Sequence, residues 1–424
     1  MLLSKEQQAI LDGSQGETMA KIMKTIVMYG DTFGADRLIP ITSEQGHLVT
    51  SFGINVMTPY VDMFEALLAD GIVSKQQFTV DPSPVDMDNV PASFLQRIVF
   101  KVLYKNQEKY DDQLMRMGLK GKDMYTCTCY MDEVGNIPNK GEILSWAESS
   151  AVVYANSVLG ARCNRNSGII EMFGSILGLV PNFGLLTDDG RKAPWIIEVK
   201  TSKVPEAQVL GSAIGLKVME DVPYIKGLDK FIGNELTDDA KAYLKDMGAA
   251  TASNGAVGLY HVDGLTPDAV ELGEDLILKD AKVYTIDDAE LLRVQESYPC
   301  IWKDPDAKPK LAFIGCPHLS LKQLKDWSIA IDKTLKENGR KKVAVPTVLT
   351  AAMPVIEAFK KTEEYKVLLD TGATLSYICP LMYMSNPLCA KMPVVTTSNK
   401  LRTYTTAKYY RDSQMLDILG KGTI

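Results

Sequence analysis

The most regular pattern of apolar positions in the chain lies between Glu142 and Gly160. Apolar residues recur there every three or four positions, which predicts a helix with one buried stripe: Ala147, Ala151, Tyr154, Ala155, Val158 and Leu159. The opposite face carries one carboxylate and small polar groups: Glu148, Ser149, Asn156 and Ser157. Such a face either contacts a small polar ligand or packs closely between domains, and the spacing leaves both interpretations open.

The first half of the chain alternates helical and extended patterns. Residues 1–38 predict a short helix, a glycine-containing turn and a second, longer helix that ends near Gly30. Short apolar runs predict strands at 38–42, 195–200 and 253–262, the last one fully buried. Residues 76–86 predict a strand and loop with Asp81 and Asp86 as polar candidates, where turn formation with the following proline is the expected role of Asp81.

The last third of the chain gives the clearest topology, because four strand-like runs alternate with helical segments. The runs are Leu311–Gly315, Lys342–Pro346, Tyr365–Leu369 and Met392–Val395. This order predicts a parallel, doubly wound sheet whose strand exits meet at one edge. Those exits carry chemistry-bearing residues: Cys316 to His318, Thr347, Asp370 to Gly372, and Thr396 to Lys400.

The fold class is therefore α/β, with doubly wound parallel sheets. A chain of 424 residues is long enough for two or three packed subdomains. The turns and composition changes place their boundaries at 1–140, 141–305 and 306–424.

Composition excludes several classes of partner. The hydrophobic content of 46% and charged content of 23% are typical of a globular protein. A net charge of −7 without a Lys/Arg stripe argues against a nucleic acid. No apolar run has membrane-spanning length and the N-terminus lacks a signal-peptide pattern, so we expect no membrane and a cytoplasmic location.

The cysteines and histidines limit the metal chemistry. Seven cysteines without a disulfide-framework spacing are expected to be buried residues, metal ligands or nucleophiles. Three histidines exclude a His-rich site, so a bound metal would need thiolate, carboxylate or substrate oxygen. Cys316 follows a predicted strand at the start of a helix, where a thiolate is stabilised. Cys127 and Cys129 form a CxC pair, which is also compatible with a structural zinc site.

Several of these stretches resemble the aconitase X family, a divergent branch of the aconitase superfamily. The matching motifs are TCTCY at 126–130, where the family has proline in place of Cys129, WAESSAVVYANSVLGAR at 146–162 and GCPHLS at 315–320. Ser398 and Lys400 match a C-terminal Asn-Ser-x-Lys in which Thr397 replaces the asparagine. The resemblance covers nearly the whole chain. It implies an aconitase-like fold and a hydro-lyase that uses a thiolate-bound iron or iron–sulfur centre as Lewis acid.

The resemblance also implies a set of site residues. Cys127 and Cys316 are the expected metal ligands, with Cys379 as third, because Gly372 stands where the family's third cysteine follows an Asp-Thr pair. The expected substrate-binding residues have hydroxyl, amide, imidazole or cationic side chains: Ser149, Asn156, Ser157, Arg162, Asn164, His318, Ser398 and Lys400. Arg191 is a further candidate for holding an anionic substrate, although a place at the solvated surface is its expected role.

Family members act on cis-3-hydroxy-L-proline or on mevalonate 5-phosphate. A phosphate favours cations or exposed backbone amides, and the absence of a glycine-rich phosphate loop favours cis-3-hydroxy-L-proline. Members also carry a small swivel domain with the catalytic serine region, either fused or as a separate subunit. We expect that domain to be missing from this chain and supplied by a small subunit that brings the catalytic base. The contrasting hypothesis is a non-catalytic binding or scaffold protein without a cluster. In that case Gly372 would mark the position at which the family's third cysteine has been lost.

Overall fold

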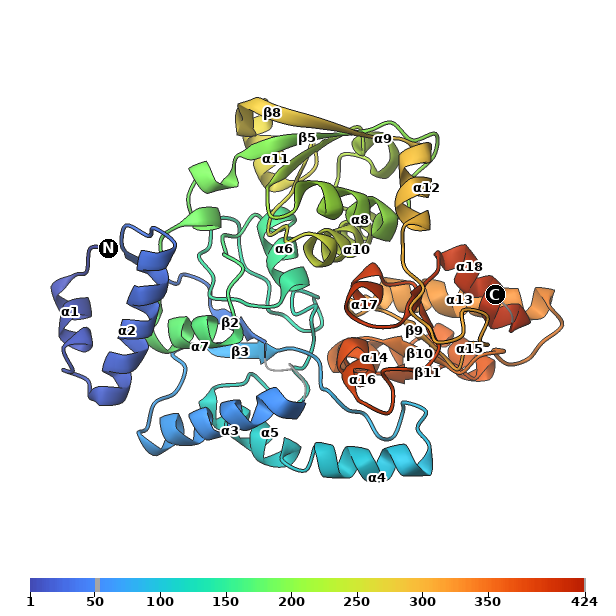
Figure 1. Ribbon diagram of the computed structural model, residues 1–424, viewed down its shortest axis with the longest axis horizontal. Helices are drawn as coiled ribbons and strands as arrows, with labels where there is room; N and C mark the ends of the chain where they lie inside the picture. The colour runs from blue at the N-terminus through green and yellow to red at the C-terminus, as the bar shows by residue number, and fades with distance from the viewer. Residues whose placement is uncertain (50–53, 423–424) are drawn as a thin grey trace.

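The computed structural model describes residues 1–49 and 54–422. Figure 1 shows groups of helices and strands arranged around a central region that holds β2 (Gln45–Leu48), β3 (Gln77–Val80) and α6 (Ser149–Ser157). Within the described residues, no helix is both long and apolar enough to cross a membrane.

The N-terminal part begins with the two predicted helices, α1 (Lys5–Leu11) and α2 (Glu17–Thr32). Ser4 starts α1 through a capping box with Gln7, which satisfies N–H groups that have no partner inside the helix. Strand β1 pairs antiparallel with β4, and β2 pairs parallel with β3. The other elements of this part are β1 (Leu38–Pro40), α3 (Ile54–Ala69), α4 (Phe94–Leu103), α5 (Gln107–Met117), α7 (Gly168–Leu177), β4 (Leu179–Pro181), η1 (Gly184–Leu186) and η2 (Asp189–Arg191).

The helix predicted from near Glu142 begins later than its apolar pattern indicates. Residues 142–147 are extended, because Ile143 bridges to Arg162 and Trp146 bridges to His47 in short parallel contacts. Helix α6 starts only at Ser149. The helix therefore begins seven residues after Glu142, and only Ala147 of the predicted apolar stripe lies in the segment before it.

The central part contains a parallel sheet in the order β7-β6-β5-β8, packed against α8 and α10. The two helices approach closely because Gly211 and Gly215 have no side chain to collide with the backbone of α10. The strand predicted at 253–262 is wrong for most of its length: residues 253–254 end α10, residues 255–260 are neither helix nor strand, and only His261–Val262 form a strand, β7. The elements are β5 (Ala193–Val199), α8 (Ala207–Val218), β6 (Pro223–Lys226), α9 (Asp229–Ile232), α10 (Asp238–Asn254), β7 (His261–Val262), α11 (Pro267–Leu272), η3 (Gly273–Leu276), β8 (Ile277–Ile286) and α12 (Asp288–Glu296).

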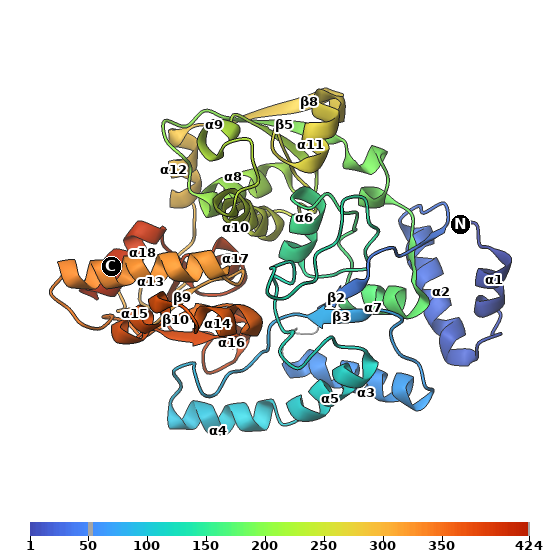
Figure 2. The same cartoon turned by 180° about the vertical axis from the view of Figure 1, so that it is seen from behind.

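The C-terminal part is a five-stranded parallel sheet in the order β11-β10-β9-β12-β13, which confirms the predicted doubly wound topology. Helices cover both of its faces, and Figure 2 shows α13 across the face seen from behind. The elements are β9 (Leu311–Ile314), α13 (Leu321–Glu337), β10 (Thr347–Thr350), α14 (Met353–Phe359), α15 (Glu363–Thr371), β11 (Thr374–Ser376), α16 (Pro380–Ser385), β12 (Val394–Thr396), α17 (Asn399–Tyr404), β13 (Lys408–Tyr409) and α18 (Asp412–Lys421).

Two strands of this sheet lie later in the sequence than predicted. Residues 365–369 belong to helix α15, which ends at Gly372 in the left-handed conformation that glycine favours (φ 76°). The strand predicted at 342–346 is instead β10, at 347–350. As a result, the residue that follows the exit of β11 and starts α16 is Cys379, and Gly372 is a helix cap at the other end of that strand.

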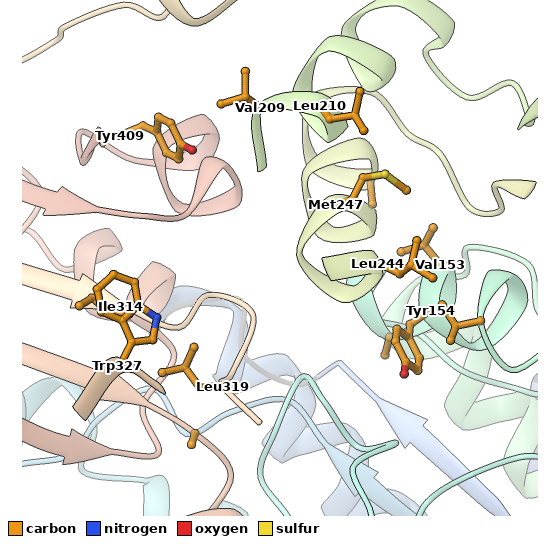
Figure 3. Close-up of a cluster of buried hydrophobic side chains, with 14 of the residues drawn as sticks. Val153, Tyr154, Val209, Leu210, Leu244, Met247, Ile314, Leu319, Trp327 and Tyr409 are labelled. Carbon is orange, nitrogen blue, oxygen red and sulfur yellow. The ribbon is translucent and has the colours of Figure 1, made fainter. Parts of the chain in front are cut away.

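A shared hydrophobic core holds the central and C-terminal parts together. Figure 3 shows side chains from α6, α8 and α10 facing side chains from the sheet and α13. These buried residues are Val153, Tyr154, Val209, Leu210, Leu244, Met247, Ile314, Leu319, Trp327 and Tyr409. The edge of the C-terminal sheet is thereby held against the rest of the molecule.

Candidate active site

A cavity of about 330 Å³ lies where the N-terminal part, α6 and the edge of the C-terminal sheet meet. Its wall carries three thiols, two carboxyl groups and an ammonium group: Cys127, Cys316, Cys379, Asp81, Glu148 and Lys400. A larger cavity of about 480 Å³ shares the Cys316 loop, but its lining holds only this one of the three thiols, and its titratable side chains are otherwise acidic or phenolic with no Lys or Arg among them. The smaller cavity is therefore the candidate active site.

Three separate segments bring the three thiols to this cavity. The segment of Cys127 is held beside β3, because the Thr126 N–H donates to the carbonyl of Val80 at 2.7 Å. Cys316 follows β9, and Cys379 follows β11 at the start of α16. Burial raises the pKa of all three thiols, that of Cys379 to about 12. At neutral pH they keep their protons until a cation or metal ion stabilises the thiolate.

Cys129 faces a different environment from its neighbour Cys127. It is fully buried in the hydrophobic core and is not part of the cavity wall, as alternation in an extended segment requires. Across residues 1–49 and 54–422, no three His, Cys, Asp or Glu side chains lie close enough together to hold a metal ion as placed. The two thiols of the CxC pair therefore face different surroundings, Cys127 the cavity and Cys129 the core.

Glu148 and Lys400 form a buried ion pair in the cavity wall. Their side chains are 5% and 11% exposed, and the Lys400 ammonium also donates to the Ser150 hydroxyl at 3.1 Å. Although burial opposes the ionisation of Glu148, Lys400 and hydrogen bonds from Ser150 and the Ala151 N–H hold its pKa below the ordinary value. Glu148 also has a positive φ of 85°, a strained conformation that is typical of functional sites. The pair is charged at neutral pH.

Asp81 is the second carboxyl group of the cavity, although its sequence context favoured a turn. It directly follows β3, and its Oδ1 atom is buried without a hydrogen-bond partner. Burial and the nearby Glu148 raise its pKa well above the ordinary value. His47 lies 3.9 Å away, and burial lowers its pKa to about 4, so it is neutral. The position after a strand was the available signal, but the following proline pointed to a turn.

We expect Asp81→Asn to unfold at a higher temperature than the natural protein. A carboxyl group whose pKa is raised on folding binds its proton more tightly when folded. The free energy of unfolding therefore falls as the pH rises above the ordinary pKa of 3.8. Asparagine does not ionise and removes that loss. The measurement is Tm between pH 4 and pH 8, where the advantage of the variant should first grow with pH. Equal Tm values at every pH would contradict the assigned environment.

Asn156 and Ser157 lie outside the cavity, which corrects their expected role in substrate binding. The Asn156 amide donates to the carbonyls of Cys163 and Gly258, both at 2.8 Å. The Ser157 hydroxyl accepts from the Tyr260 N–H at 2.9 Å. Of the two interpretations of this helix face, close packing between parts of the chain therefore holds for these residues.

Arg162 and Asn164 also serve the fold, and the expectation that they bind substrate is corrected. The Arg162 guanidinium binds the Leu186 carbonyl at 3.0 Å and Asp188 at 2.5 Å. The Asn164 side chain binds the backbone of 183–185. Both residues point toward this loop because they lie two apart in an extended segment. The following Arg165 and Asn166 instead line a cavity of about 360 Å³ that adjoins the first at Glu148 and Ser149.

The remaining predicted residues surround the thiol-lined cavity. Ser149 and Lys400 are part of its wall. The Ser398 hydroxyl caps α17 and binds the Cys316 carbonyl, so it holds the Cys316 loop. His318 borders the cavity, but both of its ring nitrogens are hydrogen bonded to the protein, which leaves none free for a substrate.

Arg191 is buried, which contradicts its expected place at the surface. Its side chain is 2% exposed and lies 2.8 Å from Asp268, with further bonds to the backbone of Asn156 and Ala161. We expect Arg191→Met to lower the free energy of unfolding by about 3–5 kcal/mol, because Asp268 loses its partner. Urea unfolding measures this. Arg162→Met is the matched control, and it should lower the free energy of unfolding by less than about 1 kcal/mol because its partner Asp188 is solvated. Equal losses in the two variants would contradict the prediction.

Three thiols that line one cavity from separate segments of an α/β chain are the side chains that metal-dependent and thiol enzymes use. Comparison with known families is more specific. Residues 1–189 match the model of the aconitase X first domain, and residues 193–296 match that of the aconitase X second domain. The chain belongs to the aconitase X family.

Curated relatives carry two names. The chain is 34% identical over 357 residues to the phosphomevalonate dehydratase large subunit of Thermococcus kodakarensis, covering 84% of this chain and 82% of that protein. It is 32% identical over 393 residues to the protein of that name from Methanosarcina mazei, covering 90% of each. It is 27% identical to the cis-3-hydroxy-L-proline dehydratase of Pseudomonas aeruginosa, covering 87% of this chain and 60% of that one.

A solved structure shares the fold. The crystal structure of Thermococcus kodakaraensis aconitase X in its holo form matches with a TM-score of 0.80 and 27% identity, over 99% of this chain and 100% of that one. The aconitase-like fold is thereby confirmed. Since the relatives are named dehydratases, the chain is an enzyme of the lyase class, a dehydratase of the aconitase X type.

Proposed function

We propose that this chain is the large subunit of a dehydratase that removes water from mevalonate 5-phosphate. The observation that carries the proposal is the match in identity and length to the phosphomevalonate dehydratase large subunits, 34% with 82% of that chain covered for the first. The cis-3-hydroxy-L-proline dehydratases match at 27–28% and over only 52–60% of their length. This reverses the preference for hydroxyproline that the sequence alone gave.

The cavity also contains groups that can bind a phosphate, although the sequence has no glycine-rich phosphate loop. Asn166, Ser167 and Gly168 line it at the first turn of α7, a ten-residue helix whose N-terminus has no side-chain cap. Free N–H groups at a helix N-terminus bind anions. Arg165 lines the adjoining cavity, which shares Asn166 with this one. Together they supply the amides and the cation that a phosphate requires, without a glycine-rich loop.

The donor set suits a thiolate-held metal in its chemistry, since Cys127, Cys316 and Cys379 line one cavity from three segments, and their side chains would have to draw closer together than they are placed to hold an ion. Aconitase-like proteins generally use iron–sulfur clusters, and thiolate is a preferred ligand of such centres. When bound, the iron or iron–sulfur centre would supply a Lewis acid for the leaving hydroxyl group. Gly372 lies outside this cavity wall, so its lack of a thiol does not remove a cavity ligand.

The other polar residues of the wall have separate roles in this proposal. The Lys400 ammonium holds the substrate carboxylate, and Glu148 fixes the direction of that ammonium. Asp81 enters the reaction protonated and gives its proton to the departing hydroxyl, which leaves as water. The proton on the neighbouring carbon goes to a base that we place on the small subunit.

We further propose a separate small subunit with the swivel domain. The relatives named large subunit imply such a partner. We place the complex in the cytoplasm, where thiols stay reduced; all seven cysteines of the chain are free.

Anaerobic purification of the complex, followed by a visible spectrum and iron, sulfide and zinc analysis, tests the cofactor. Broad visible absorbance with iron and sulfide is expected. A protein that contains neither iron nor sulfide under these conditions, yet binds mevalonate 5-phosphate, would contradict the proposal and favour the cluster-less binding protein.

A further inference from the structure

His318 is in contact with each of the three segments that carry the cavity thiols. It lies two residues after Cys316 and is fully buried. Its backbone N–H donates to the Cys127 sulfur at 3.4 Å. Its ring nitrogen Nδ1 lies 3.1 Å from the Thr126 hydroxyl, and Nε2 lies 3.1 Å from the carbonyl of Ile378, the residue before Cys379. The His318 side chain, on the Cys316 segment, thus connects the Cys127 segment to the Cys379 segment.

The contacts define a single tautomer of this ring. A carbonyl oxygen only accepts, so Nε2 carries the proton and donates it to Ile378. Nδ1 is then unprotonated and accepts from the Thr126 hydroxyl. Thr126 is fixed in turn, because its oxygen accepts from the Thr128 N–H at 3.0 Å. A neutral ring with both nitrogens engaged is a rigid spacer between the two outer segments.

The loop that carries His318 is itself tethered from two helices. Lys245 of α10, which is 1% exposed, donates from its ammonium to the His318 carbonyl at 3.1 Å and to Asp246 at 2.8 Å. The Ser398 hydroxyl at the start of α17 donates to the Cys316 carbonyl. The position of His318 is thereby fixed independently of any ligand in the cavity.

We propose that His318 is a positioning residue that sets the relative positions of Cys127, Cys316 and Cys379, so that the three thiolates bind one metal centre together. This inference rests on the proposed role of these cysteines as ligands. His318 acts through its two ring hydrogen bonds and touches neither substrate nor metal. Partners outside the ligand shell that orient metal ligands are typically worth about 10- to 100-fold in metal affinity.

The test is titration of the full chain, prepared without iron, with Cd²⁺, followed by the ultraviolet absorbance of cadmium–thiolate bonds. We expect Cys127→Ser, Cys316→Ser and Cys379→Ser each to remove the tight binding. His318→Gln keeps a donor near Ile378 but loses the Thr126 contact, and should bind Cd²⁺ about 10- to 100-fold more weakly. Thr126→Val removes the same contact from the other side and should weaken binding in the same direction.

The matched control is His261→Gln. His261 is 1% exposed, burial lowers its pKa to about 4, and it binds the Arg191 carbonyl at 2.8 Å, away from the thiols. Its variant should bind Cd²⁺ like the natural protein. Tight binding retained in both His318→Gln and Thr126→Val would overturn the positioning role alone. Tight binding retained in the three cysteine variants would instead overturn the ligand assignment of the proposed function.

Discussion

Lys400→Met is expected to abolish dehydration and to lower the free energy of unfolding by about 3–5 kcal/mol. The ammonium lies in the cavity wall against Glu148, and both side chains are nearly buried. Removing it leaves a buried carboxylate without its counter-charge, which is more costly than removing both members of the pair. Urea unfolding and an assay of water loss measure the two effects.

Glu148→Gln completes a double-mutant cycle with Lys400→Met. We expect the double variant to be more stable than Lys400→Met alone, because glutamine carries no charge into the buried site. Lys322→Met is the control: that lysine is 39% exposed and pairs with solvated carboxylates, so its loss should cost less than about 1 kcal/mol. Additive effects of the two cavity substitutions would show that Glu148 and Lys400 do not interact.

Cys316→Ser is expected to lower activity by more than about 100-fold. Loss of a residue that only orients a metal ligand costs up to about 100-fold, and loss of a ligand itself should cost more. The same loss is expected for Cys127→Ser and for Cys379→Ser, because all three thiols line one cavity. Iron content per chain should fall in parallel with activity. Cys300→Ser is the control, since this exposed thiol lies outside the cavity wall and its loss should change neither quantity.

Variants at Cys379 and Gly372 distinguish two hypotheses, in which the third metal ligand is either Cys379 or a cysteine at position 372. If it is the ligand, Cys379→Ser is inactive and Gly372→Cys does not restore activity. Gly372 caps α15 with φ 76°, and a Cβ there would meet the Lys342 side chain at 2.9 Å, so a cysteine at this position would be strained. An active Cys379→Ser enzyme with full iron content would contradict the assignment.

The sequence predicted the topology of the C-terminal sheet because its strands are short apolar runs between long helices. It placed residues 365–369 wrongly, because a helix with apolar Val367, Leu368 and Leu369 has the composition of a buried strand. That error assigned the strand exit to Gly372. With β11 at 374–376, the same rule about strand exits leads to Cys379, which the structure places in the cavity.

Polar site residues were harder to separate from polar residues of the fold. Asn156 and Arg162 carry the amide and cation expected of a binding site, yet they bind the carbonyls of Gly258 and Leu186, 102 and 24 residues away in sequence, which no local pattern reveals. Asp81 and Glu148 line the cavity, but their local sequence context indicated structural roles. A proline after Asp81 indicated a turn, and Glu148 was assigned to a helix interior although it is the strained residue before α6.

The most direct test of the central claim is the loss of one water molecule from mevalonate 5-phosphate, followed by mass spectrometry. The enzyme is the anaerobically purified complex of this chain with its small subunit, with iron content measured on the same sample. We expect dehydration of mevalonate 5-phosphate, no turnover of cis-3-hydroxy-L-proline, and no activity from the Cys316→Ser complex. Turnover of cis-3-hydroxy-L-proline alone, or equal activity in the Cys316→Ser complex, would contradict the account.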